Sequence, residues 1–178
     1  MLHEDCRGSV MVEVALIVPA IMFLLLAGVT LAHIVQLSRA ADRAAAVLAD
    51  DFSQRTSLEE TDFDIALMAA SELIDTGGFE VTPWLSITAV EMHPVSGATT
   101  IWNRSRNGGA GDCTGADPAY SAPVGAADGG GILHLVQVDL CATPGAGFFL
   151  SSALSVMDFS IHARATASAR AAALRGLN

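Results

Sequence analysis

Hydrophobic positions divide the chain into one long apolar run and a later region of shorter, patterned segments. No residue from Val14 to Val35 is charged. At 1.5 Å per residue a helix of this length reaches about 33 Å, and a bilayer core requires roughly 20 such residues. The run therefore predicts one membrane-spanning helix. Glu13 lies at its edge, where an ionisable group costs about 2 to 3 kcal/mol, so this carboxylate is expected to have a partner.

The helix is expected to continue beyond the membrane. The segment from Ser38 to Asp51 is rich in alanine and contains neither glycine nor proline. These features predict a single helix from about Ser9 to about Phe52.

A second, amphipathic helix is predicted from Ser57 to Thr76. Ser57 and Glu60 have the spacing of a capping box, and Gly77 supplies a stop signal. The apolar positions between them recur at helical spacing and fall on one face: Phe63, Leu67, Ala70 and Ile74.

Beyond residue 80 the apolar positions alternate with a period of two, which is typical of strands. A turn signal at Ser96-Gly97 predicts a hairpin, and Asn107 to Gly131 reads as a long loop. The expected strands are 81–90, 99–103, 132–141 and 159–168. The fold class is therefore α+β: a long N-terminal transmembrane helix, a second amphipathic helix, and a small antiparallel sheet of about four strands with that second helix on one face.

Composition narrows the classes of function. The formal net charge is −10 and all nine basic residues are arginine. This charge argues against binding nucleic acid or anionic lipid through a broad basic surface, because such binding depends on basic contacts to phosphates. The sequence shows no recognisable motif for a catalytic serine, histidine and aspartate. The carboxylates at the start of the second helix suit the helix dipole rather than acid–base catalysis. We therefore expect no enzyme activity and no cofactor.

The three cysteines lie on different sides of the apolar run. Cys6 precedes it, whereas Cys113 and Cys141 follow it. In an oxidising compartment the last two can form a disulfide that closes a loop of about 28 residues, worth roughly 3 to 4 kcal/mol. The alternative is two free cysteines. A metal site is not expected, because the cysteines lack a close second ligand and the histidines are scattered.

The N-terminal motif carries a resemblance to a known family. Arg7-Gly8-Ser9-Val10-Met11-Val12-Glu13, followed by an apolar helix with Pro19, resembles the class III signal of type IV pilins and pseudopilins. More closely, this N-terminus is similar to the TadE/TadF family, the minor pseudopilins of the bacterial tight-adherence (Tad, or Flp) pilus. The close resemblance covers about residues 7–48, and it does not distinguish a TadE-like from a TadF-like chain.

The resemblance implies roles for individual residues. A prepilin peptidase would cut between Gly8 and Ser9, which makes Glu13 the fifth residue of the mature chain. Its carboxylate would pair with a free terminal amine, either on a neighbouring subunit or, at i,i+4 spacing, on Ser9 of the same chain. The expected organisation is a leader at 1–8, a transmembrane and extended helix at 9–52, and a periplasmic α+β domain at 53–178. Pro19 is expected to kink the helix mildly.

The implied function is non-catalytic participation in the assembly of a Tad/Flp-type pilus for surface adherence. The implied partners are prepilin peptidase, other Tad pseudopilins, the major pilin and membrane lipid. The implied location is the bacterial inner membrane, in a single pass with the N-terminus cytoplasmic and the C-terminal domain periplasmic. An alternative from another class is an uncleaved, signal-anchored envelope protein that binds a ligand and has no role in a pilus.

Overall fold

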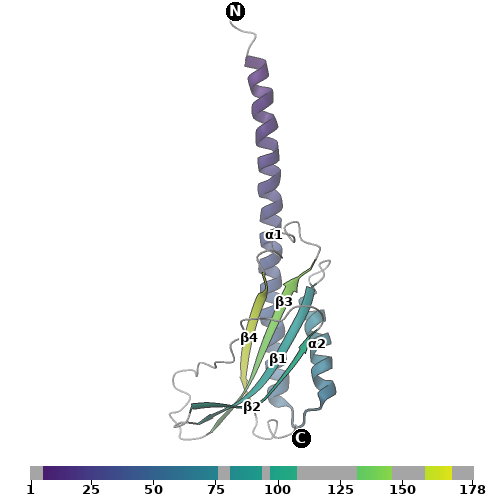
Figure 1. Ribbon diagram of the computed structural model, residues 1–178, viewed down its shortest axis with the longest axis vertical. Coiled ribbons are helices and arrows are strands. Elements are labelled where there is room, and N and C mark those ends of the chain that lie inside the picture. Colours follow the sequence, from purple (N-terminus) through teal and green to yellow (C-terminus); the bar gives the residue numbers. More distant parts are fainter. Residues whose placement is uncertain (1–5, 76–80, 94–96, 108–131, 146–158, 170–178) are drawn as a thin grey trace, which may run out of the picture.

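The structure is a computed structural model, and it describes residues 6–75, 81–93, 97–107, 132–145 and 159–169, with side chains from Met11 onward. Two helices precede four strands: α1 (Cys6–Gln54), α2 (Glu60–Ile74), β1 (Val81–His93), β2 (Gly97–Asn107), β3 (Leu133–Pro144) and β4 (Ile161–Ser168). The strands form one sheet in the order β2-β1-β3-β4, with antiparallel neighbours throughout. The α+β architecture predicted from the sequence is confirmed (Figure 1).

Helix α1 has two halves with different surroundings. Its first half projects away from the rest of the molecule, whereas its second half lies against the sheet (Figure 1). In the second half, the residues at intervals of three and four are buried: Leu37, Ala41, Ala44, Ala45, Leu48, Ala49 and Phe52. Most are alanines, which let the helix backbone approach the sheet closely. The core of the folded domain therefore includes half of the N-terminal helix.

The sheet supplies the other side of this core. Side chains alternate between its two faces, so that every second residue of a strand points toward the helices. The buried residues on that face are Leu85, Ile87 and Ala89 of β1, Trp102 of β2, Val136, Val138, Leu140 and Ala142 of β3, and Ile161 and Ala163 of β4. The alternating pattern in the sequence had placed strands at these positions, and the structure confirms them.

The opposite face of the sheet carries a polar row that the sequence analysis missed. The amide of Asn103 donates to the hydroxyls of Ser86 and Thr88, at 3.0 and 2.6 Å. Farther along the row, the amide of Gln137 donates to the carboxylate of Asp139 at 2.6 Å. Four of these side chains are buried: Ser86, Thr88, Gln137 and Asp139. Buried polar groups are costly unless hydrogen-bonded, and this row satisfies them both between β1 and β2 and within β3.

Helix α2 begins two residues later than the sequence indicated. Its N-cap is Glu59 rather than Ser57, and the carboxylate of Asp62, at the third helical position, accepts from the backbone N–H of Glu59 at 2.8 Å. The capping box predicted for Ser57 and Glu60 was therefore wrong in register, because an aspartate three residues after Glu59 fills the same role. The helix ends at Ile74. The predicted stop at Gly77 lies outside the described residues.

Candidate functional site: the projecting half of helix α1

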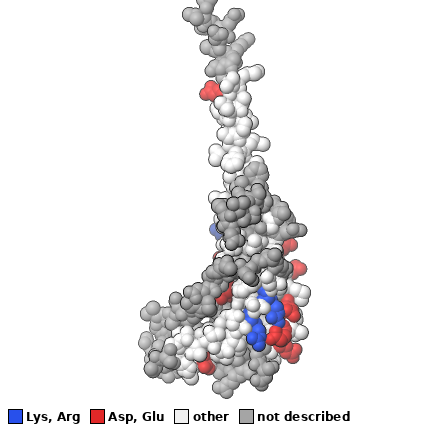
Figure 2. Space-filling view, in the orientation of Figure 1, with Lys and Arg blue, Asp and Glu red and all other residues white. Residues whose placement is uncertain are grey.

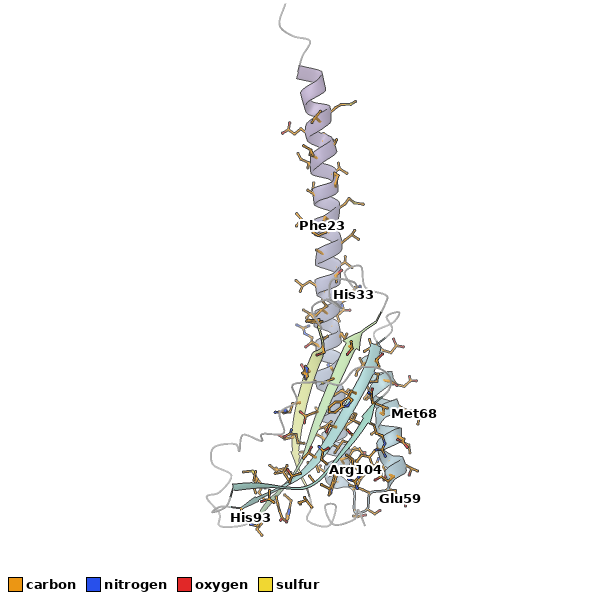
Figure 3. The ribbon with its side chains drawn as sticks, viewed as in Figure 1. Phe23, His33, Glu59, Met68, His93 and Arg104 are labelled. Atoms are coloured by element: carbon orange, nitrogen blue, oxygen red, sulfur yellow. The ribbon has the colours of Figure 1, made fainter. Side chains whose placement is uncertain are left out.

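The candidate site is the projecting half of α1, which presents apolar side chains on every side. Leu16 is 72% exposed, Phe23 57% and Leu24 69%. Phe23 extends away from the helix with no other element beside it (Figure 3). Soluble monomers rarely expose such a large continuous apolar surface, so this segment is built to be covered by lipid or by other apolar helices. Within the described residues, α1 is the one helix long and apolar enough to cross a membrane, which suggests single-pass anchoring.

Glu13 is the only carboxylate between Met11 and Ala41. Figure 2 shows an acidic spot on the otherwise uncharged part of the projecting helix that is described. No hydrogen bond or ion pair joins it to another side chain in the part of the chain that the structure describes. It lies about 24 Å along the helix from Val29, the last residue before the domain begins to cover α1. Glu13 is therefore near the end of the projecting segment that is remote from the domain.

The predicted cleavage position lies inside the first turn of the helix. The backbone is helical from Cys6 onward, so the bond between Gly8 and Ser9 belongs to the start of α1. A peptidase that binds its substrate in an extended conformation would have to unwind this turn. A glycine at the cut assists, since it reaches extended conformations without a side chain in the way. Cleavage at this bond stays a prediction.

Two residues of the anchor, Pro19 and Gly28, are of types that are unfavourable inside a helix. Pro19 lies within α1, which continues through it without interruption, and the expected mild kink stays a prediction. A Cβ atom added to Gly28 would meet nothing within 4 Å. The lack of a side chain at Gly28 is therefore not required by the packing of this chain on itself.

A charged group joins the end of α1 to the start of α2. One Nη atom of Arg55 lies 2.7 Å from the carboxylate of Asp51, and the other lies 2.7 Å from that of Asp62. The guanidinium group also covers the ring of Phe52, at 5.1 Å from its centroid. Arg55 therefore fixes the turn between the helices, a contact that helical periodicity alone does not reveal.

A second charged cluster holds α2 against the edge strand β2. Arg104 Nε lies 3.0 Å from Glu60 Oε1, and Arg106 Nε lies 2.7 Å from Asp64 Oδ1. Arg106 also pairs with Glu60, and basic and acidic surfaces meet at this edge (Figure 2). Hydrogen bonds from Arg106, and then from Arg104, lower the pKa of Glu60. Hydrogen bonds to Glu60, and then to Asp64, raise the pKa of Arg106. These acids therefore position a helix, and their partners lie too far away in sequence to be predicted from the helix itself.

Two histidines of the sheet, His93 and His134, lie beside one carboxylate rather than in a ligand set. At the end of β1, His93 Nε2 and His134 Nδ1 lie 3.5 and 3.3 Å from the two carboxylate oxygens of Glu91. No group of three His, Cys, Asp or Glu side chains in the described ranges is arranged to hold a metal ion. These residues therefore add no metal chemistry to the candidate site.

Cys141 is disulfide-bonded. Its sulfur lies 3.1 Å from Nδ1 of His162 on the neighbouring strand β4. Cys113, the partner expected from the sequence, lies outside the described residues. The pairing of these two cysteines thus stays a prediction.

Comparison with known proteins finds one family model that matches the helix. Residues 8–50 match the family model described as TadE-like protein. This match confirms the resemblance read from the N-terminal motif, and it points to a Tad pilus-associated protein. Searches of curated proteins and of solved structures found no match. The matched residues lie within α1, so the family signal belongs to the helix that forms the candidate site.

Proposed function

We propose that this chain, whose anchor helix carries the TadE-like match, is a non-catalytic minor pseudopilin that takes part in assembling a Tad/Flp-type pilus for surface adherence. The observation that carries the proposal is that the family match and the candidate site fall on the same helix. The matched region contains the whole projecting apolar segment, the exposed Glu13 and nearly all of the buried stripe that attaches the helix to the domain. One helix thus contains both the membrane anchor and the segment that packs into the folded domain.

The dimensions of the helix support a single membrane pass. From Ser9, the proposed mature N-terminus, to Val29 the helix rises about 30 Å, which matches the roughly 30 Å of a bilayer core. The domain begins to cover α1 at Thr30, which is only 4% exposed. The N-terminus and the domain would therefore lie on opposite sides of the bacterial inner membrane. We assign the N-terminus to the cytoplasm and the domain to the periplasm, as the family resemblance implies.

Glu13 is proposed to be an assembly contact. An exposed carboxylate near the apolar core of a membrane is unfavourable by itself, and pairing with an amine removes much of that cost. Cleavage after Gly8 would create such an amine at Ser9. The amine of a neighbouring subunit and that of the same chain are both candidates.

The proposed partners follow from the exposed surface. Prepilin peptidase would act on the first turn of α1, and membrane lipid would cover the projecting segment before assembly. Other Tad pseudopilins and the major pilin would then pack against the same helix. This proposal assigns no reaction to the chain, and energy for assembly would come from other proteins.

The test combines the mature N-terminus with two substitutions. Mass spectrometry of the chain from its native host should show a mature protein beginning at Ser9. Gly8→Val should leave the leader attached, and Glu13→Gln should reduce pilus formation while leaving cleavage intact. Glu72→Gln, which removes an exposed carboxylate from α2, is the matched control and should leave pilus formation unchanged.

A chain that retains Met1 would favour the alternative, an uncleaved anchored protein that binds an envelope ligand. The central proposal would fail if neither the Gly8 nor the Glu13 variant impaired pilus formation. It would also fail if the Glu72 control reduced pili as strongly as the Glu13 variant, because the loss would then reflect net charge.

A further inference from the structure

Helix α2 carries a second apolar stripe, beside the one that faces the core. The side chains of Ile65, Met68 and Leu73 are between 46 and 60% exposed. Met68 extends outward from the helix, away from the sheet (Figure 3). Beyond Val35, these three are half of the six large hydrophobic residues that the described part of the chain leaves exposed. Exposed apolar side chains of the domain are therefore concentrated on this one helix.

The spacing of this stripe matches a known mode of helix packing. In knobs-into-holes packing, four residues of one helix, at i, i+3, i+4 and i+7, surround a hole that receives a side chain from a second helix. In α2 these positions are occupied by Ile65, Met68, Ala69 and Glu72, which we call the α2 socket. Ala69 is small, so the middle of the socket is lower than the side chains of Ile65 and Met68 beside it. This shape suits an apolar side chain from a partner helix.

The charges of α2 limit the kind of partner. All four charged residues of the helix are acidic, and three of them pair with arginines of this chain: Glu60, Asp62 and Asp64. Glu72, at the fourth corner of the socket, forms no ion pair within the described residues. It lies near the C-terminal end of α2, where a carboxylate is unfavourable and the last turn contains no basic residue. A cation of a partner at this corner would offset that unfavourable charge.

A second copy of this chain is a poor occupant. Two α2 helices in contact would place carboxylates against carboxylates, and each chain carries a net charge of −10. Like charges brought together at an interface oppose binding and select against such a partner. The charge of the socket therefore favours a different, basic protein segment.

We propose that the α2 socket binds an amphipathic helix of another protein, which inserts an apolar side chain between Ile65 and Met68 and places an arginine or lysine beside Glu72. The apolar contact supplies most of the affinity, because an exposed ion pair contributes little. The charge instead selects the partner and its orientation. The socket lies on α2 rather than on the projecting half of α1, and the proposal does not depend on a role in a pilus.

The test captures the occupant in the native host. Met68→benzoylphenylalanine introduces a photoreactive side chain into the full chain, cells are irradiated, and the crosslinked peptide is sequenced by mass spectrometry. The expected product joins residue 68 to a segment of another protein with apolar residues at helical spacing and an arginine or lysine within one turn of them. Thr166→benzoylphenylalanine is the matched control, at an exposed position of the distant edge strand β4, and should not capture this segment.

Substitutions in the Met68 probe chain, expressed below saturation of the crosslink, test the socket itself. Ile65→Asn should lower the crosslink yield by about tenfold, because it removes apolar area that the partner covers. Glu72→Arg should also lower it by about tenfold, since repulsion replaces attraction, whereas Glu72→Gln should lower it by no more than about threefold. Both positions are exposed, so these variants should keep the unfolding free energy of the domain nearly unchanged.

Several results would overturn the proposal. Residue 68 could crosslink only to a second copy of this chain, only to lipid, or to nothing. The captured segment could lack basic residues. Ile65→Asn or Glu72→Arg could leave the yield unchanged, or the Thr166 probe could capture the same segment as strongly.

Discussion

Replacing Phe63 with alanine should severely destabilise the domain, because this ring joins three elements. Phe63 lies on α2 and is 1% exposed. Its ring centroid lies 5.5 Å from that of Phe52 on α1 and 5.8 Å from that of Trp102 on β2, with the last pair nearly perpendicular at 86°. The guanidinium group of Arg106 covers the ring at 5.6 Å. Removing the ring therefore withdraws the common neighbour of two aromatic side chains and one cation.

The expected loss can be worked from these contacts. Truncating a buried phenylalanine to alanine typically costs about 3 to 5 kcal/mol, which includes the cavity that remains. Each well-oriented aromatic pair contributes roughly 0.5 to 1.5 kcal/mol beyond the area it buries. Phe63 has two such partners, and the backbones that carry them are held apart by the sheet and by α1, so the cavity cannot close easily. We expect a loss of about 4 kcal/mol in the free energy of unfolding.

The assay is urea unfolding of the full chain in detergent, followed by the fluorescence of Trp84 and Trp102. Phe23→Ala is the matched control, since it makes the same chemical change at a ring that is 57% exposed on the projecting helix. That variant should change the unfolding free energy of the domain by less than about 0.5 kcal/mol. A loss below about 1.5 kcal/mol for Phe63→Ala, or an equal loss for both variants, would refute the reasoning.

Three further predictions follow from features of the same structure. Because the pKa of Glu60 is lowered in the folded state, its contribution to stability is complete above its ordinary value of 4.5 and declines as the pH falls below it; Glu60→Gln should flatten this part of a plot of stability against pH, whereas Glu72→Gln should not. Gly28→Ala should preserve or slightly raise helix stability in the monomer, by up to about 1 kcal/mol measured by thermal circular dichroism, and a fall in stability would show close packing there. Non-reducing peptide mapping should find Cys141 joined to Cys113; a bridge to Cys6, which begins the far end of α1, would contradict this pairing.

Local patterns in the sequence were sufficient to predict most elements of the fold. The uncharged run and the alanine-rich segment after it predicted one continuous helix, and α1 extends from Cys6 to Gln54. Alternation predicted the four strands, because each strand has one face in the core. The apolar stripe of α2 was also found, with Phe63 and Ile74 buried as expected. These features depend on neighbours within one turn or one strand, and sequence spacing records such neighbours.

The missed features depend on contacts between distant segments. The cap of α2 was misplaced because serine is a common N-cap, while Asp62 makes the reciprocal bond to Glu59. The partners of Glu60 on β2 follow from the placement of a helix over an edge strand, which no local pattern encodes. The buried polar row on the far face of the sheet was not predicted, since the burial of Gln137 depends on strand pairing that no local pattern records. Within the anchor, sequence alone predicts roles for Glu13 and Gly8, because the motif there is local, and these roles stay predictions.

The continuity of α1 has a mechanical consequence. The helix passes from its apolar half into the core without a linker, and its buried stripe crosses the sheet through Leu37 to Phe52. A pulling force applied at the membrane end would reach the packed interior directly and load that interface along the helix axis. Many small apolar contacts would then resist together rather than one after another. A force that extracts the anchor from the membrane would therefore also act on the packing that keeps the domain folded.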